Sequence, residues 1–268
     1  MAKILFYVMG QKGFYTISKF IEKFGSESIA FIVCAKDNNI KNDYFEDIHQ
    51  LAKISKIKFF TRSDDYSEIE KNTGMFKFAI SWKWLIADQE RLIIFHDSLL
   101  PKYRGFAPLV NSLINQESEI GVTAIEASEN YDEGNIVSQK KIKITYPIKI
   151  NEAIDKILPL YFELVDELFM VISKNKVLKS EIQNNEEATF SPWLDKKDFF
   201  INWSWSASKI KRFVDAVNTP YDGAKAYLND EIINFVDVEV VNDVTIENRN
   251  RHIGKVIFII DEMPVLIC

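Results

Sequence analysis

The chain has 268 residues, of which 47% are hydrophobic and 27% are charged, and its formal net charge is −6. This length suffices for roughly one or two domains with a sizeable core. A protein that binds a polynucleotide needs Lys and Arg clustered against phosphates. The sequence has no basic run of that kind, so its composition argues against nucleic acid as a partner but does not exclude small anionic ligands.

Cysteine usage and hydropathy indicate the cellular compartment of the protein. Cys34 ends an apolar run at residues 29–34, which predicts a buried thiol in a core strand, and Cys268 is the last residue. Two such cysteines form no disulfide framework, which fits a reducing cytoplasm. The N-terminal run lacks a signal-peptide cleavage pattern, and no apolar stretch approaches the ~18 residues of a membrane span. We therefore expect a cytoplasmic protein without a membrane segment.

The first half of the chain alternates short apolar runs with helical patterns. Strands are predicted at residues 3–8, 29–34, 57–60, 76–80 and 92–95, and helices at 14–24 and 44–54. Such alternation predicts an α/β fold with a Rossmann-like, doubly wound and mostly parallel sheet. Ligands bind outside the carboxyl ends of the strands in such sheets, and His96 directly follows the strand predicted at 92–95.

The second half begins with a helix at 107–115 and strands at 122–127 and 136–144. A long amphipathic helix follows over 153–172, and Pro159 inside it predicts a kink or break. The polar stretch 174–189 is interpreted as a linker, which divides the chain into a domain at 1–180 and a smaller one at 190–268.

The smaller predicted domain is rich in aromatic residues and short strands. Its aromatic cluster is interpreted as core rather than as a stacking platform; it comprises Phe190, Trp193, Phe199, Phe200, Trp203 and Trp205. After a helix near 206–217, short strands at 224–228, 232–241, 255–260 and 265–268 are typical of a small β-rich barrel. The chain stops inside that pattern, so a truncated barrel with unpaired edges, used for a homodimer, is one expectation.

Three short motifs carry the chemical signal. Residues 95–105 read FHDSLLPKYRG, residues 121–123 read GVT, and residues 131–136 read YDEGNI. His96 stands at a strand end, and Asp132 stands in a loop between two strands. The combination resembles the formyltransferase family that uses 10-formyltetrahydrofolate, and residues 95–109 are most similar to its sugar N-formyltransferases. Residues 193–224 resemble the opening of that family's C-terminal domain.

The resemblance implies formyl transfer to an amine, with His96 and Asp132 as catalytic residues. Such a reaction needs a proton acceptor for the amine and a donor for the charge that develops on the formyl oxygen. A histidine side chain can accept or donate a proton near neutral pH, which suits His96 to this role, and Asp132 would orient it or help to deprotonate the amine. A structural His and a turn-forming Asp are the competing interpretations.

The resemblance also implies a folate slot after the strand at 76–80. Trp82, Trp84, Leu85 and Ile86 are its candidate residues, with core packing as the equal alternative for the last three. The loop 126–132, including Asp132, is expected to close the other side of the slot.

Several residues are candidates for holding the acceptor substrate. Gly10, Gln11, Lys12 and Gly13 form either a simple turn or a loop in which Lys12, beside Gln11, binds a phosphate. In the Tyr103–Arg104–Gly105 motif, Arg104 matches phosphate geometry, although Tyr103 and Arg104 could equally hold the loop in shape.

One position departs from the family motif. The family has Asn two residues before the His, where this chain has Ile94, and an apolar side chain cannot donate to an oxyanion. Protonated His96, backbone amides or Asn111 are the candidate replacements. Asp97, directly after His96, is a further carboxylate that could modify the site.

The function indicated is an N-formyltransferase that moves a formyl group from 10-formyltetrahydrofolate to a nucleotide-linked (UDP or dTDP) 3- or 4-amino deoxysugar, for bacterial lipopolysaccharide, capsule or flagellar glycans. Methionyl-tRNA formyltransferase, a formyl-folate hydrolase and a non-catalytic folate or sugar-nucleotide binding protein stay open as alternatives. Three isolated histidines and two distant cysteines give no metal-ligand spacing, so no metal is expected.

Overall fold

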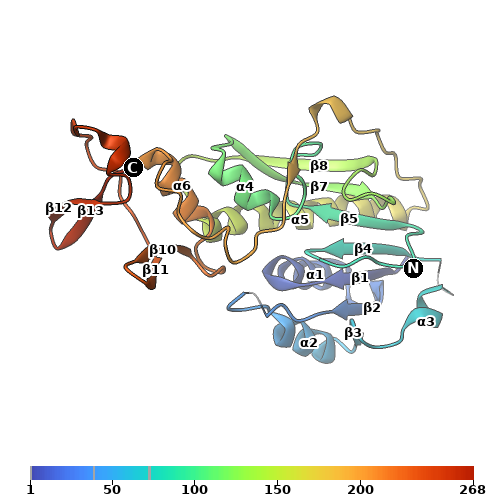
Figure 1. Cartoon of the computed structure of the whole chain (residues 1–268). Coiled ribbons are helices and arrows are strands. Elements are labelled where there is room, and N and C mark those ends of the chain that lie inside the picture. Colours follow the sequence, from blue (N-terminus) through green and yellow to red (C-terminus); the bar gives the residue numbers. More distant parts are fainter. Residues whose placement is uncertain (1, 39, 72–73) are drawn as a thin grey trace.

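The centre of the molecule is a seven-stranded sheet (Figure 1). The computed structural model describes residues 2–38, 40–71 and 74–268. The strands are ordered β3-β2-β1-β4-β5-β7-β8. Their bounds are β1 (Ile4–Val8), β2 (Ile29–Cys34), β3 (Lys58–Thr61), β4 (Phe76–Ile80), β5 (Leu92–His96), β7 (Glu119–Glu126) and β8 (Ile136–Lys143). The first five strands are parallel, whereas β7 and β8 run antiparallel to their neighbours. The predicted α/β fold with a mostly parallel sheet is confirmed.

Six α-helices and three short 3-10 turns are described. The helices are α1 (Gly10–Phe24), α2 (Phe45–Ile54), α3 (Ser67–Lys71), α4 (Pro108–Ile114), α5 (Ile150–Ser173) and α6 (Ala207–Ala216), and the turns are η1 (Ser26–Ser28), η2 (Asn185–Glu187) and η3 (Arg249–Arg251). Within the described ranges, no helix has both the length and the apolar character to cross a membrane.

Helix α1 begins four residues earlier than the sequence predicted, so Gly10 to Gly13 form its first turn and not a separate loop. The reason is the close approach of the helix to the preceding strand. A Cβ added at Gly13 would lie 2.9 Å from the Cβ of Val8, and only glycine avoids that contact. Lys12 is thereby fixed on a helix at the carboxyl end of β1.

The two faces of the sheet are covered differently. Because side chains alternate along a strand, Ile4, Phe6 and Val8 of β1 pack into the large core with α1, α2 and α5. Leu5 and Tyr7 face the opposite side, where partly buried Trp82, Ile86 and Ile94 complete a smaller cluster. The loop after β4 thus covers the second face close to the carboxyl ends of the strands.

Helix α5 is continuous through Pro159, so the break that the sequence suggested does not occur. Proline removes one hydrogen bond and crowds the preceding turn. Here the buried stripe that includes Leu158, Tyr161 and Leu164 packs α5 onto the sheet and α1 on both sides of the proline. Tertiary packing outweighs the local penalty.

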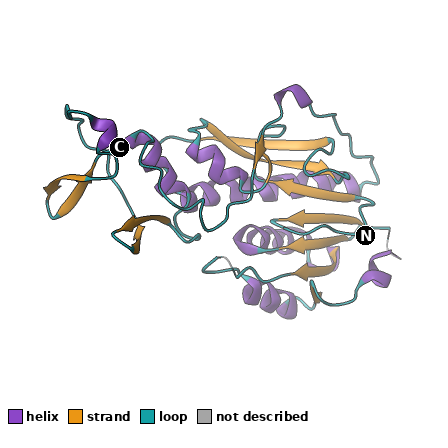
Figure 2. Cartoon of the chain, in the orientation of Figure 1, coloured by secondary structure: helices purple, strands orange, loops and turns teal. Residues whose placement is uncertain are grey.

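The C-terminal region consists of two separate hairpins that extend away from the sheet (Figures 1 and 2). Strand β10 (Ala224–Leu228) pairs with β11 (Glu231–Phe235), and β12 (Val256–Ile260) pairs with β13 (Met263–Leu266). The β-rich prediction is confirmed, but the strand predicted to Val241 ends at Phe235. Among the described residues the two hairpins form no closed barrel.

The aromatic cluster predicted as a second core is divided. Phe199, Trp203 and Trp205 pack against the main core. Phe190 and Trp193 instead are 68% and 47% exposed. Phe190 lies in β9 (Phe190–Ser191), which pairs with β6 (Arg104–Gly105). This short pair ties the chain after α5 to the FHDSLLPKYRG segment.

Candidate active site

A cavity of about 770 Å³ lies at the carboxyl ends of β4 and β5. Its lining comes from the loop after β4, the end of β5, the loop after β6, the β7–β8 loop and the segment before α6. A second hollow of about 960 Å³ lies beside Ala2, Lys3 and Phe76 and contains none of the predicted catalytic residues. The site is therefore the smaller of these two cavities, where the chemistry-bearing side chains converge.

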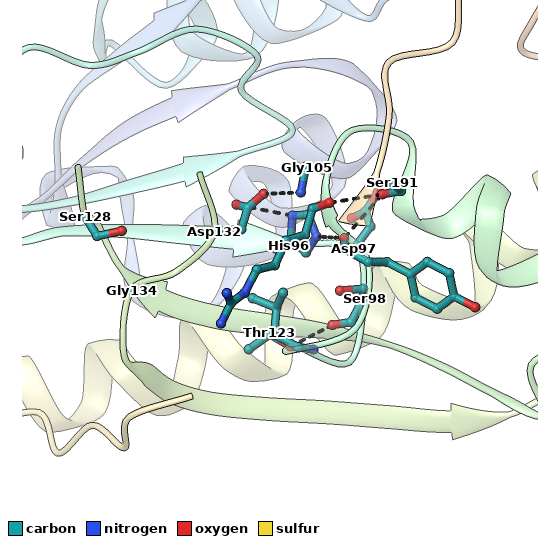
Figure 3. A network of polar contacts seen from close by, with 12 residues as sticks. His96, Asp97, Ser98, Gly105, Thr123, Ser128, Asp132, Gly134 and Ser191 are labelled. Atoms are coloured by element: carbon teal, nitrogen blue, oxygen red, sulfur yellow. Dashed lines mark hydrogen bonds and ion pairs between the residues drawn. The ribbon is translucent and has the colours of Figure 1, made fainter. Parts of the chain in front are cut away.

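His96 and Asp132 both line this cavity, and Figure 3 shows their side chains next to each other. His96 is buried, and its Nε2 lies 2.8 Å from the carbonyl oxygen of Tyr103. A carbonyl can only accept, so Nε2 carries a hydrogen and donates it. Nδ1 lies 3.4 Å from Oδ1 of Asp132. A nitrogen lone pair and a carboxylate oxygen attract each other only through a proton, so a proton placed on Nδ1 would lie between the imidazole and this carboxylate.

Asp132 is held by its own backbone conformation and by one backbone amide. Its own backbone is left-handed, with φ 56°. Its Oδ2 accepts a 2.8 Å hydrogen bond from the Gly105 N–H. Gly105 has φ 99°, and a Cβ there would lie 2.6 Å from the carbonyl oxygen of Ser191, so glycine is required at this point. The YRG motif therefore holds the carboxylate through a backbone amide.

The SLLP and GVT motifs contact each other through Thr123. Its hydroxyl donates to the carbonyl of Ser98 at 2.6 Å and accepts from the Leu100 N–H at 3.2 Å. Gln139 also donates to this hydroxyl, at 2.7 Å. Two motifs that are separate in the sequence thus form one buried hydrogen-bond network below His96 (Figure 3).

Tyr103 and Arg104 point away from the cavity and are not among its lining residues. Arg104 is 2% exposed, and both its Nε and Nη2 donate to Gln183 Oε1, at 3.1 and 2.9 Å. The Tyr103 hydroxyl donates to Glu117 at 2.8 Å, and burial raises the pKa of this phenol to about 12. A phosphate-binding Arg104 does not fit these contacts, whereas the alternative that both residues shape the loop does.

Gln183 is a site residue that the sequence did not reveal. It lies in the segment interpreted as a linker, yet it is 5% exposed. While its Oε1 accepts from Arg104, its Nε2 donates to the carbonyls of Asp132 and Gly134, each at 2.7 Å. The segment therefore fixes the loop that carries Asp132. No periodicity or motif in the sequence signals this role.

The predicted folate slot lines the cavity, since Trp82, Trp84, Leu85 and Ile86 all face it. The Trp82 ring packs edge-on against Tyr7 and Trp84, with ring centroids 5.1 and 5.3 Å apart. Its indole nitrogen is buried and has no hydrogen-bond partner among the described residues. Ile94 lines the same region and adds to its apolar character.

The remaining predicted substrate residues divide between cavity and surroundings. Lys12 lines the cavity, where its ammonium pairs with Asp97. Gln11 lies outside the lining and donates to Asp155 at 3.0 Å. Asn111 also lies outside, and its amide donates to the Ala107 carbonyl of its own helix at 3.0 Å. Asn111 is therefore not placed to stabilise an oxyanion, because its side chain does not line the cavity.

Over the described ranges, no group of three or more His, Cys, Asp or Glu side chains is arranged to hold a metal ion.

Comparison with known proteins extends these observations. Residues 75–158 match the family model described as formyl transferase, and residues 194–268 match the model of the formyl transferase C-terminal domain. A methionyl-tRNA formyltransferase of Clostridioides difficile is 32% identical over 60% of this chain and 50% of its own length. The bifunctional polymyxin resistance protein ArnA of Wigglesworthia glossinidia is 29% identical over 86% of this chain and 37% of its own length. The chain spans about half the length of the methionyl-tRNA formyltransferases it matches.

Among solved structures, the N-formyltransferase of Helicobacter canadensis, in complex with folinic acid and dTDP-3-aminofucose, has a TM-score of 0.70 at 17% identity. The comparison covers 91% of this chain and 89% of that one, and shows a shared fold. Since both the N-terminal and the C-terminal models match and the fold agrees, the chain belongs to the formyl transferase family.

Proposed function

We propose that the chain transfers a formyl group from 10-formyltetrahydrofolate to the amine of a nucleotide-linked 3- or 4-amino deoxysugar. The observation that carries this proposal is the His96–Asp132 contact at one cavity, with an aromatic slot on one side and a polar wall on the other. The formyl donor and the amine that accepts the formyl group can then meet beside the same pair of proton-handling residues.

The slot residues fit the proposed formyl donor. A folate has a planar ring system with polar edges, and the slot offers Trp82, Trp84 and the apolar Ile94. The unpaired indole N–H of Trp82 is a donor that a ring acceptor of the folate would satisfy. When bound, 10-formyltetrahydrofolate supplies the electrophilic formyl carbon.

His96 and Asp132 handle the protons of this reaction. The amine must attack as a free base, and the departing folate nitrogen must receive a proton. Because Nε2 of His96 is committed to the Tyr103 carbonyl, the Nδ1–Asp132 contact is the part of the pair that exchanges a proton with the reacting groups. Ile94 cannot donate a hydrogen bond, so the protonated pair also stabilises the charge on the formyl oxygen.

Two lysines at the cavity support a nucleotide-linked sugar as the acceptor of the formyl group. Lys196 lines the cavity, as does Lys83 at the edge of the slot, whose ammonium pairs with Asp37 and lies 5.6 Å from the ring centroid of exposed Trp193. These cations suit a diphosphate. Solved relatives of similar fold include one crystallised with dTDP-3-aminofucose. A formylated product of this kind would serve lipopolysaccharide, capsule or flagellar glycans, and cysteine usage favours the cytoplasm.

Methionyl-tRNA is the second candidate acceptor, because several relatives of about 30% identity are methionyl-tRNA formyltransferases. The charge of the chain argues against it. A tRNA needs many cationic contacts, whereas the chain carries a net charge of −6 and the cavity is bordered by Glu129, Asp195 and Asp222 as well as by its lysines.

The C-terminal hairpins support the expectation of a homodimer, since they expose apolar residues such as Leu228, Ile232 and Ile259, each more than half exposed. Unpaired strand edges promote association between chains. Light scattering after size-exclusion chromatography that shows only monomer would contradict this expectation.

The decisive experiment is a spectrophotometric assay with 10-formyltetrahydrofolate and a panel of UDP- and dTDP-linked 3- and 4-amino deoxysugars. Turnover on one sugar, absent in His96→Asn, would support the proposal and identify the acceptor. Tight binding of folinic acid without turnover on any sugar would refute the sugar assignment. Charged methionyl-tRNA would then be tested under the same conditions.

A further inference from the structure

A buried charged triad lies in the wall of the cavity on the acceptor side. Asp97, directly after His96, pairs with the Lys12 ammonium through Oδ2 and accepts from the Tyr161 hydroxyl through Oδ1. Lys12 comes from α1 and Tyr161 from α5, and all three residues line the cavity. The side chains of Lys12 and Asp97 are only 13% and 15% exposed.

Packing alone does not explain this triad. Removing two charges from water is costly, and apolar residues of similar volume often replace a buried ion pair without loss of stability. Apolar Phe95, whose ring centroid lies 6.2 Å from that of Tyr161, lines the same cavity, and apolar residues would suit these surroundings. A charged group kept inside a cavity wall is therefore a candidate for binding a ligand.

The charge state of the triad is set by its contacts. Burial lowers the pKa of Lys12, but the charge interactions with Asp97 and Tyr221 and the hydrogen bond to Asp97 together raise it by more, so the pKa lies above its ordinary value and the ammonium is retained. Burial raises the pKa of Tyr161 well above its usual range, so the phenol stays a donor. Both partners therefore donate to Asp97. A carboxylate has roughly four acceptor positions, which leaves two for a ligand.

Position distinguishes Asp97 from the other carboxylates of the cavity. Glu129, Asp195 and Asp222 are exposed at its mouth. Among the described residues that line the cavity, only Asp97 and Asp132 are sheltered carboxylates. Asp132 is engaged by His96 and by the Gly105 N–H. Asp97 also has two partners, Lys12 and Tyr161, but it is not part of the proposed proton-handling pair, so its two remaining acceptor positions can serve an incoming group.

We propose that Asp97 binds the amino group of the formyl acceptor and selects an amine over a hydroxyl, and that Lys12 and Tyr161 position its carboxylate. This inference rests on the proposed formyl transfer. An acceptor that arrives as an ammonium gives up two protons. Its nitrogen forms a bond to the formyl carbon, the bond from that carbon to N10 of the folate breaks, N10 takes one proton, and the other leaves to water through the His96–Asp132 pair.

The test compares Asp97→Asn with wild type, using Asp230→Asn, an exposed carboxylate outside the cavity, as the matched control. Hydrogen bonds to charged groups contribute about 1.5–3 kcal/mol. Asp97→Asn should therefore raise the KM for the amino sugar by roughly 10- to 100-fold. The affinity for folinic acid and for the hydroxyl analogues UDP-glucose and dTDP-glucose should stay within about twofold. Tyr161→Phe should shift the same KM in the same direction, but less.

Asp97→Asn leaves the Lys12 ammonium without its partner, so a Lys12→Met/Asp97→Asn double variant serves if the single variant does not fold. Folded protein with an unchanged KM for the amine would overturn the proposal. Equal losses of amino sugar and hydroxyl analogue binding would also overturn it.

If the wild-type protein formylates no sugar nucleotide, the proposed substrate is wrong, but the role of Asp97 can still be tested. The same comparison is then made with 2-aminoethanol at high concentration as a nucleotide-free amine, against hydrolysis of 10-formyltetrahydrofolate by water. A lower ratio of aminolysis to hydrolysis in Asp97→Asn supports the role of Asp97, and an unchanged ratio refutes it.

Discussion

Replacing Gln183 tests whether the segment after α5 holds the catalytic loop. In Gln183→Leu, the two Arg104 hydrogen bonds to Oε1 disappear, and the carbonyls of Asp132 and Gly134 lose their donor. Arg104 retains Asn185 at 2.8 Å and Glu133 at 3.5 Å. Each buried polar group left without a partner costs about 1–3 kcal/mol.

The free energy of unfolding should therefore fall by about 3 kcal/mol or more. For a chain of this size that corresponds to a decrease in Tm of roughly 6–12 °C. Activity should fall by about tenfold or more, because a catalytic group displaced by about 1 Å can cost two orders of magnitude in rate. Circular dichroism melts and the formyl-transfer assay measure the two effects.

Two further variants sharpen this test. Gln183→Glu keeps an acceptor for Arg104 but sets a carboxylate oxygen against the two carbonyls, so it should reduce activity more than it reduces stability. Lys179→Leu, an exposed change in the same segment, should alter neither. If Gln183→Leu melts within about 1 °C of wild type and retains full turnover, the segment does not hold the loop and the reasoning is wrong.

The other predictions concern three further positions. Ile94→Asn restores a donor in the slot and should raise kcat if the oxyanion lacks one; unchanged or lower kcat in folded protein would show that the His96–Asp132 pair already suffices. Thr123→Val removes a hydroxyl that connects the SLLP and GVT segments, so the free energy of unfolding should fall by about 1–3 kcal/mol in urea titration; a change below about 0.5 kcal/mol would contradict the network. Burial raises the pKa of the Cys34 thiol to about 12 and shields the thiol from solvent. At pH 8, iodoacetamide should therefore label half-buried Cys268 well before Cys34, as followed by mass spectrometry. Equal labelling of the two cysteines in folded protein would refute this prediction.

The sequence by itself determined the α/β class and the strands of the parallel sheet. These strands are short runs of apolar residues buried on both faces, and that pattern is local and needs no tertiary information. The proposed catalytic pair could also be named from the sequence, because His96 and Asp132 lie in motifs whose residue order resembles a known family, and the structure brings the two side chains together. The strand that precedes the proposed slot likewise indicated where its residues line the cavity.

Only the tertiary structure decided which polar side chains face the cavity. Arg104 and Lys12 are both cations near a motif, yet one is buried against Gln183 and the other lines the wall beside Asp97. Nothing local distinguishes them, because partners 79 and 85 residues away in the chain determine where each side chain points. Gln183 and Tyr161 contribute for the same reason: their roles come from contacts between segments that only the folded chain brings together.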